Sequence, residues 1–98
     1  MWRHGDVLIA SVGRIPNGVR RLPGAVLAWG EITGHSHRIE DDRSAELYAR
    51  DDVMYIRVTA PEARLVHEEQ LPIVLPQGDY KFWFQREYTP EAIKRIID

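Results

Sequence analysis

The sequence predicts an all-β fold, a small single-domain barrel or jelly-roll-like sandwich of about eight short strands, ending in a short C-terminal helix or a last strand. Turn-forming residues recur at short intervals and divide the chain into brief runs rich in Val, Ile, Leu, Tyr and Trp. A chain of 98 residues has the size of one domain, so residues 1–98 are expected to share one core. Short strands in such a chain hide their apolar faces only by closing into a barrel or packing as two sheets.

The N-terminal half is predicted to hold three strands, over residues 6–12, 25–33 and 35–39. Residues 14–24 contain two prolines and two glycines and are expected to form a long loop. The strand at 25–33 is apolar on both faces, which favours a central position in the sheet.

The C-terminal half is predicted to hold five strands, over residues 45–50, 53–60, 63–67, 71–75 and 80–85. The first two flank Asp51-Asp52, a two-residue connection of hairpin length. Pro61 is expected to separate the second from the third, and residues 76–79 are expected to form a turn. The aromatic strand at 80–85 should anchor the core, and Thr89-Pro90-Glu91 has the pattern of a helix start.

The composition narrows the classes of function. The chain has no cysteine, which excludes disulfides, thiolate metal sites and cysteine nucleophiles. Its formal net charge of -2 provides no global field that would attract nucleic acid, so such binding would need a local basic patch. Because the sequence shows neither a signal-peptide pattern nor an apolar run of membrane-spanning length, we expect a cytoplasmic protein.

Two histidines, His35 and His37, form the clearest chemical motif. On a strand their side chains share one face, about 7 Å apart at the backbone, so both can reach one metal ion. His67, at the end of a predicted strand, is the first candidate for a third ligand of zinc, iron, manganese or nickel. The candidate oxygen donors nearby in the sequence are Glu40, Asp41, Glu68 and Glu69. His4 lies in a polar N-terminal segment and is expected to be a surface residue.

The segments Gly34-His35-Ser36-His37 and Pro76-Gln77-Gly78 resemble a reduced form of the two cupin motifs. The resemblance implies a small β-barrel that binds one divalent metal, with His35 and His37 as ligands. The positions of the cupin glutamate hold Asp41 and Asp42 here, and Lys81 stands where the second motif has its histidine. The remaining ligand would therefore come from another strand end.

A second polar cluster, Gln85-Arg86-Glu87-Tyr88, follows the aromatic strand. As a surface ion pair it would contribute little. If the fold brings it to the histidines, Arg86 can bind a carboxylate or phosphate in bidentate fashion and Tyr88 can orient a substrate oxygen.

Three functions remain open. The first is a metal site of His35, His37 and His67 that polarises a substrate or activates water for hydrolysis or isomerisation of a small anionic molecule. The second is metal-independent phosphodiester cleavage, with His37 and His67 as general acid and base and Arg86 stabilising developing charge. The third is a structural or adaptor subunit whose histidines brace the Gly34 turn. Exposed edge strands also lead us to expect a homo-oligomer.

Overall fold

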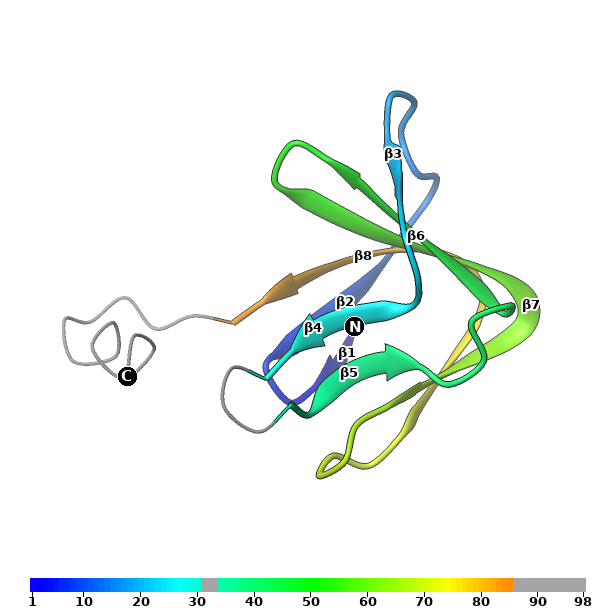
Figure 1. The fold of residues 1–98 in the computed structure, drawn as a ribbon. Helices are drawn as coiled ribbons and strands as arrows, with labels where there is room; N and C mark the ends of the chain where they lie inside the picture. Colours follow the sequence, from blue (N-terminus) through cyan, green and yellow to red (C-terminus); the bar gives the residue numbers. More distant parts are fainter. Residues whose placement is uncertain (31–33, 86–98) are drawn as a thin grey trace, which may run out of the picture.

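The computed structural model describes residues 1–30 and 34–85, which form eight antiparallel strands in one sheet and no helix (Figure 1). The strands are β1 (Trp2–His4), β2 (Val7–Val12), β3 (Arg20–Leu22), β4 (Val26–Trp29), β5 (Ser36–Ile39), β6 (Ala45–Arg50), β7 (Val53–Val66) and β8 (Ile73–Phe84). The all-β prediction and the number of strands are confirmed. The predicted C-terminal helix, from Thr89, lies outside the described residues.

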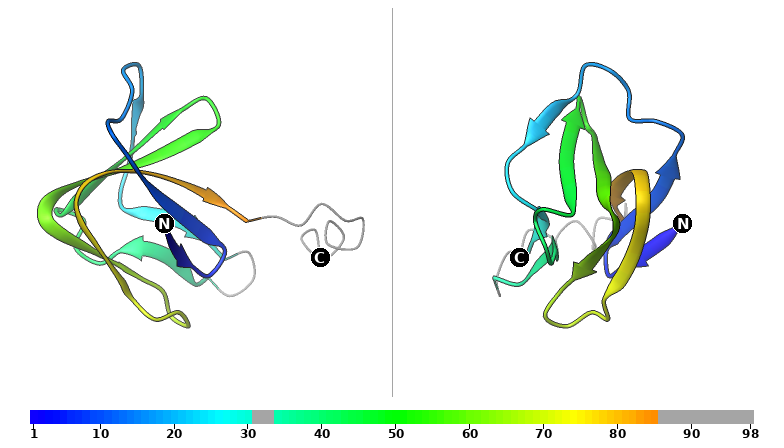
Figure 2. Two further views of the ribbon diagram at one scale, coloured as in Figure 1. Left: turned by 180° about the vertical axis from the view of Figure 1, so that it is seen from behind. Right: turned by 90° about the vertical axis from the view of Figure 1, so that its right-hand side faces the viewer.

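The sheet follows the order β1-β2-β8-β7-β5-β4, and β6 pairs with the first part of β7 and with β3. Within the described residues β1 and β4, at the two ends of this path, do not pair, so the sheet does not close into a barrel. It bends instead: β7 and β8 are long curved strands, with β4 and β5 on one side and β1 and β2 on the other (Figure 2, right).

The break predicted at Pro61 and the turn predicted at residues 76–79 are wrong, because both lie inside the continuous strands β7 and β8. The pairing of these strands shifts register where β7 carries extra residues, which form a bulge. The amides of Thr59 and Ala60 in this bulge donate to the carbonyl of Ser44, at 3.0 and 3.2 Å. These two amides therefore keep hydrogen-bond partners outside the ladder, and the pairing of β7 with β8 resumes at Glu62 and Pro76.

The predicted central strand is an edge strand, because β4 pairs with β5 alone among the described strands. Leu27 lies in the core with 7% of its surface exposed, whereas Trp29, the last residue of β4, is 70% exposed. Two short strands were also absent from the predictions: β3 lies in the predicted loop, and β1 precedes the Gly5-Asp6 turn.

The predicted hairpin and the aromatic strand are both confirmed. Arg50 pairs with Val53 across Asp51-Asp52, and Asp51 adopts the left-handed conformation (φ 54°) that such a turn needs. Tyr80 and Phe82 of β8 are 3% and 2% exposed. One apolar cluster forms the core, with contributions from β2, β4, β5, β6, β8 and both halves of β7: Val7, Ile9, Ala25, Leu27, Ile39, Ala45, Leu47, Ile56, Val58, Ala63, Leu65, Leu75, Tyr80 and Phe82.

The bent sheet therefore wraps around a single apolar interior. In the described part of the chain, no helix is long and apolar enough to cross a membrane.

Candidate functional site

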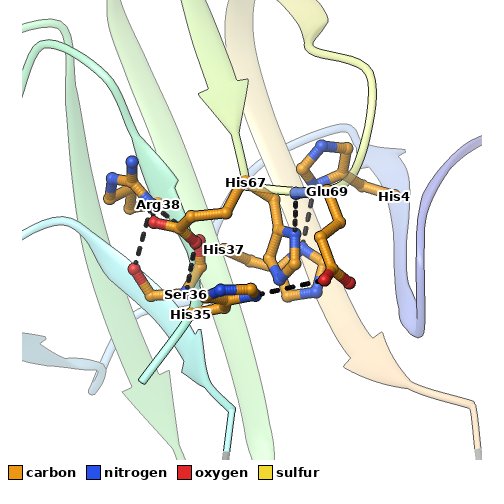
Figure 3. Close-up of polar contacts among 8 residues, drawn as sticks. His4, His35, Ser36, His37, Arg38, His67 and Glu69 are labelled. Atoms are coloured by element: carbon orange, nitrogen blue, oxygen red, sulfur yellow. Dashed lines mark hydrogen bonds and ion pairs between the residues drawn. The ribbon is translucent and has the colours of Figure 1, made fainter. Parts of the chain in front are cut away.

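All four histidines of the chain gather in one cluster, which we call the histidine cluster (Figure 3). The ring centroids of His37 and His67 are 4.4 Å apart, those of His4 and His37 are 4.9 Å apart, and those of His35 and His67 are 5.6 Å apart. The structure thus brings His67 to the predicted pair, as the sequence interpretation requires.

Sheet pairing and sheet curvature together assemble the cluster. Arg38 of β5 pairs with Val66 of β7, so one residue further along this register His37 lies opposite His67. His4 comes from β1, which three strands separate from β5 in the sheet order. Its contact with His37 therefore depends on the curvature that brings the two sides of the sheet together (Figure 2).

The prediction that His4 is a surface residue is wrong. It is 2% exposed, and its Nδ1 lies 2.8 Å from Nδ1 of His37. Burial lowers the pKa of His4, with the backbone of Leu71 opposing and His67 adding to the effect. Burial also lowers the pKa of His37 to about 4, with further contributions from His67 and His4. Both rings are therefore neutral at neutral pH, and each keeps one nitrogen lone pair.

Glu68 supplies a carboxylate at the edge of the cluster. It accepts hydrogen bonds from the backbone amide of Ser36 at 2.9 Å and from Arg38 at 2.8 Å. The bond from Ser36 is the main reason that its pKa falls to about 2, and Arg38 contributes to the same shift. Glu68 is therefore ionised over the whole range in which histidines are neutral.

One ligand atom each from His35, His67 and Glu68 lie within 4.8 Å of one another. Nitrogen ligands at 2.0 to 2.1 Å from zinc would be separated by roughly 3.4 Å in a tetrahedron, and by roughly 3 Å at adjacent octahedral positions. An ion could therefore be held after side-chain movements on the order of 1 Å. We call these three residues the His/Glu triad.

His67 carries a further constraint, because its Nδ1 accepts a hydrogen bond from the backbone amide of Glu69 at 3.0 Å. In the neutral ring the hydrogen then sits on Nε2. To bind an ion, His67 must either break the hydrogen bond between its Nδ1 and the amide of Glu69 or lose the hydrogen from its Nε2.

The other predicted donors lie elsewhere or bind other groups. Oε1 of Glu69 is 3.8 Å from Nδ1 of His35, close to the triad but outside it. Glu40 pairs with Arg64 at 3.7 Å. Asp41 accepts from the amide and the side chain of Arg43 in the turn after β5.

The remaining predicted groups do not add to the cluster. Asp42 is exposed, and Lys81 lies over the ring of Trp83 at 5.4 Å. The proposed catalytic residues Arg86 and Tyr88 lie outside the described residues.

His4 is the residue that sequence reasoning missed. A signal was present in Gly5-Asp6, a glycine-containing pair of hairpin-turn length that comes just before the apolar run beginning at Val7. In the structure Gly5 has a φ of 60°, and its turn joins β1 to β2. That hairpin is what carries His4 into the interior.

Comparison with known proteins gives one match. The family model described as "Domain of unknown function (DUF8820)" covers residues 3–85, a range that includes all four histidines and Glu68. No curated protein and no solved structure matches the chain. The resemblance to cupins rests on the short motifs alone.

Proposed function

The chain belongs to the DUF8820 family, whose description names no activity, and we propose from the geometry that its domain binds one divalent transition-metal ion at the His/Glu triad. The observation that carries this proposal is the approach of one donor atom each from His35, His67 and Glu68 to within 4.8 Å. The three residues come from two separate segments, one before β5 and one after β7. Their meeting is a product of the fold rather than of a short sequence repeat.

The donor set fits the chemistry of such an ion. Imidazole nitrogen suits zinc, iron and nickel, and a carboxylate oxygen adds manganese to the set. The low pKa of Glu68 means that no proton competes with the ion for this ligand at neutral pH. Three protein ligands leave a coordination position for water or for a small anionic substrate, which the ion would polarise.

The test is a metal titration of protein purified without an affinity tag and stripped with a chelator. We expect one ion of Zn²⁺, Mn²⁺, Fe²⁺ or Ni²⁺ per chain by calorimetry, with binding lost in His35→Ala and Glu68→Gln. Glu40→Gln is the matched control, because this carboxylate pairs with Arg64 outside the triad. Absence of stoichiometric binding, or equal binding by all three variants, would refute the proposal.

A second function, metal-independent acid–base catalysis, is favoured by one observation. The ring centroids of His37 and His67 lie 4.4 Å apart, and the lowered pKa of His37 keeps that ring neutral at neutral pH. In such a pair a neutral imidazole can accept a proton as general base, and a protonated imidazole can return it as general acid.

This second function predicts cleavage of a chromogenic phosphodiester that survives chelation and is lost in His67→Ala. Cleavage that stops on chelation would exclude it in favour of the metal. If no histidine variant changes metal content or cleavage and all of them lose thermal stability, the cluster serves as a structural brace.

A further inference from the structure

Glu68, the carboxylate of the His/Glu triad, is the triad residue that the sheet positions least directly. It lies two residues beyond the end of β7, in a segment that is not part of a strand. Its side chain is 37% exposed. A long side chain in such a place moves among several rotamers unless its neighbours hold it. The groups that hold Glu68 therefore determine whether the carboxylate is in place before an ion arrives.

Two donors from β5 hold the two oxygens of the Glu68 carboxylate. The backbone amide of Ser36 donates to Oε1 at 2.9 Å, and Nη1 of Arg38 donates to Oε2 at 2.8 Å. Because the two bonds end on different oxygens, they restrict the rotation of the carboxylate as well as its position. We call the amide of Ser36 and the side chain of Arg38 the Glu68 clamp.

The Glu68 clamp is itself fixed to β5. Ser36 and Arg38 are two positions apart on this strand, so their side chains leave it on the same face. Nη1 of Arg38 also donates to the backbone carbonyl of Ser36 at 3.0 Å and to its Oγ at 3.2 Å (Figure 3). Ser36 is 4% exposed. The guanidinium is thus attached to a buried strand residue as well as to the carboxylate that it holds.

We propose that Arg38 is a positioning residue that, together with the amide of Ser36, holds the Glu68 carboxylate in place to bind the ion of the His/Glu triad. This inference rests on the proposed metal site. Carboxylates that bind metals are themselves hydrogen-bonded, and the loss of such outer partners weakens metal binding. Each carboxylate oxygen has two lone pairs, so Oε1 and Oε2 each keep one for an ion after the clamp has formed.

Arg38 has two opposite effects on a bound ion, and this makes its role testable. Its guanidinium is positively charged and repels a cation bound to Glu68. By holding Glu68 in advance, it also removes the cost of ordering that side chain when the ion binds. Charge alone therefore predicts tighter binding when Arg38 is replaced by a neutral residue, whereas positioning predicts weaker binding.

The first measurement needs no variant. In the metal-free chain, ¹H–¹⁵N spectra report how fast the guanidinium hydrogens exchange with water. Those on Nη1 of Arg38 should exchange more slowly than those of Arg43, whose side chain is 88% exposed. Equally fast exchange in both would overturn the proposal, whether or not any variant folds.

The second measurement is a Zn²⁺ titration of Arg38 variants. Arg38→Met should fold, because an ion pair whose side chains are 38% and 37% exposed contributes little to stability. We expect it to weaken Zn²⁺ binding about 10- to 100-fold, the usual cost of losing such a partner. Arg38→Lys should recover most of the affinity, because all three bonds of Arg38 come from Nη1 and an ammonium has three hydrogens to donate.

Arg64→Met is the matched control. It removes the same charge from the neighbouring strand β7, where Arg64 pairs with Glu40 at 3.7 Å, outside the triad. The affinity of this variant should equal or slightly exceed that of the unmodified chain. Equal losses in Arg38→Met and Arg64→Met would refute a specific role of Arg38.

The remaining outcomes separate the positioning role from the metal site. Unchanged or tighter binding by Arg38→Met would refute the positioning role while leaving the triad intact, since His35→Ala and Glu68→Gln would still abolish binding. Losses as large in Arg38→Lys as in Arg38→Met, with both variants folded, would count against a role through these hydrogen bonds. No binding by the unmodified chain would overturn the metal site and this inference together.

Discussion

Replacement of Gly5 by alanine tests the turn on which the histidine cluster depends. The change has two costs at this position. Gly5 has a φ of +60°, a conformation that L side chains rarely adopt. The new Cβ would also lie 3.0 Å from Cε1 of His37 and 3.4 Å from Cδ of Gln70, so the His37 ring must shift.

Two other glycines separate these costs. Gly24 has a φ of +73° with no atom within 4 Å of an added Cβ, so Gly24→Ala carries the backbone cost alone. Gly13 has neither a positive φ nor a close neighbour, so Gly13→Ala carries neither cost. Left-handed backbone costs an L residue roughly 1–2 kcal/mol, and the smaller entropy of the unfolded chain returns roughly 0.4–1 kcal/mol.

These values give a loss of about 1 kcal/mol for Gly24→Ala. Overpacking against His37 adds about 1 kcal/mol, the lower end of its range, because the ring and the end of Gln70 can shift. In a domain of this size the melting temperature falls by roughly 4–8 °C per kcal/mol, which predicts roughly 8–16 °C for Gly5→Ala and about half of that for Gly24→Ala.

The assay is thermal and urea unfolding followed by circular dichroism, together with imidazole spectra of His37. Gly5→Ala should shift the His37 signals, whereas Gly24→Ala and Gly13→Ala should leave them in place. If Gly5→Ala loses no more stability than Gly24→Ala and the His37 signals do not move, the close packing between the turn and the ring is wrong.

Three further predictions concern the core, the pH dependence and the metal. Leu65→Ala, at a residue with 0% exposure, should lower the free energy of unfolding measured in urea by about 2–5 kcal/mol. Val74→Ala, at 47% exposure, should change it by no more than about 0.5 kcal/mol, and similar losses in both variants would contradict the assigned core. His37 has its pKa lowered from 6.5 to about 4, so between these values the unfolded chain binds more protons and stability falls as the pH drops from 6.5 toward 4. Protonation of Glu68 adds a second loss of stability as the pH drops from 4.5 to about 2. The loss assigned to His37 would be refuted if stability did not change between neutral pH and a pH of about 5, or if it fell equally in His37→Gln. Zn²⁺ at a free concentration of about 100 times its Kd should stabilise the fold by about 2.7 kcal/mol, reversibly on chelation and not in Glu68→Gln; equal stabilisation of that variant would place the ion elsewhere.

The fold could be predicted as far as local patterns determine it. The alternation of Tyr80 and Phe82 with polar neighbours identified β8, and Asp51-Asp52 identified the hairpin, because both signals lie within a few residues. Pro61 was misleading, since a bulge whose amides bind a distant carbonyl lets one strand continue past a proline. Sheet closure and the edge position of β4 depend on pairings between distant segments, which local patterns do not reveal.

In the candidate site, too, local patterns predicted some residues, whereas contacts between distant segments determine the others. The spacing of His35 and His37 indicated that both belong to one site, and in the structure both rings contact His67, which the pairing of β5 with β7 brings to them. His4 was missed because its burial depends on the curvature of the whole sheet rather than on its own segment. Glu68 could be named as a donor but not chosen among four carboxylates, because the amide of Ser36 that binds it is 32 positions away in the sequence.

The pairing of β2 with β8 also determines when the domain can complete its sheet during synthesis. Val7 pairs with Phe84, so the first hairpin stays without its neighbour until almost the last described residue has left the ribosome. Contacts of such large sequence separation form slowly, because the intervening chain must lose its freedom before they contribute. A nascent chain halted before β8 would therefore hold the His35 and His67 segments while the β1–β2 hairpin, which carries His4, still lacked its neighbour in the sheet.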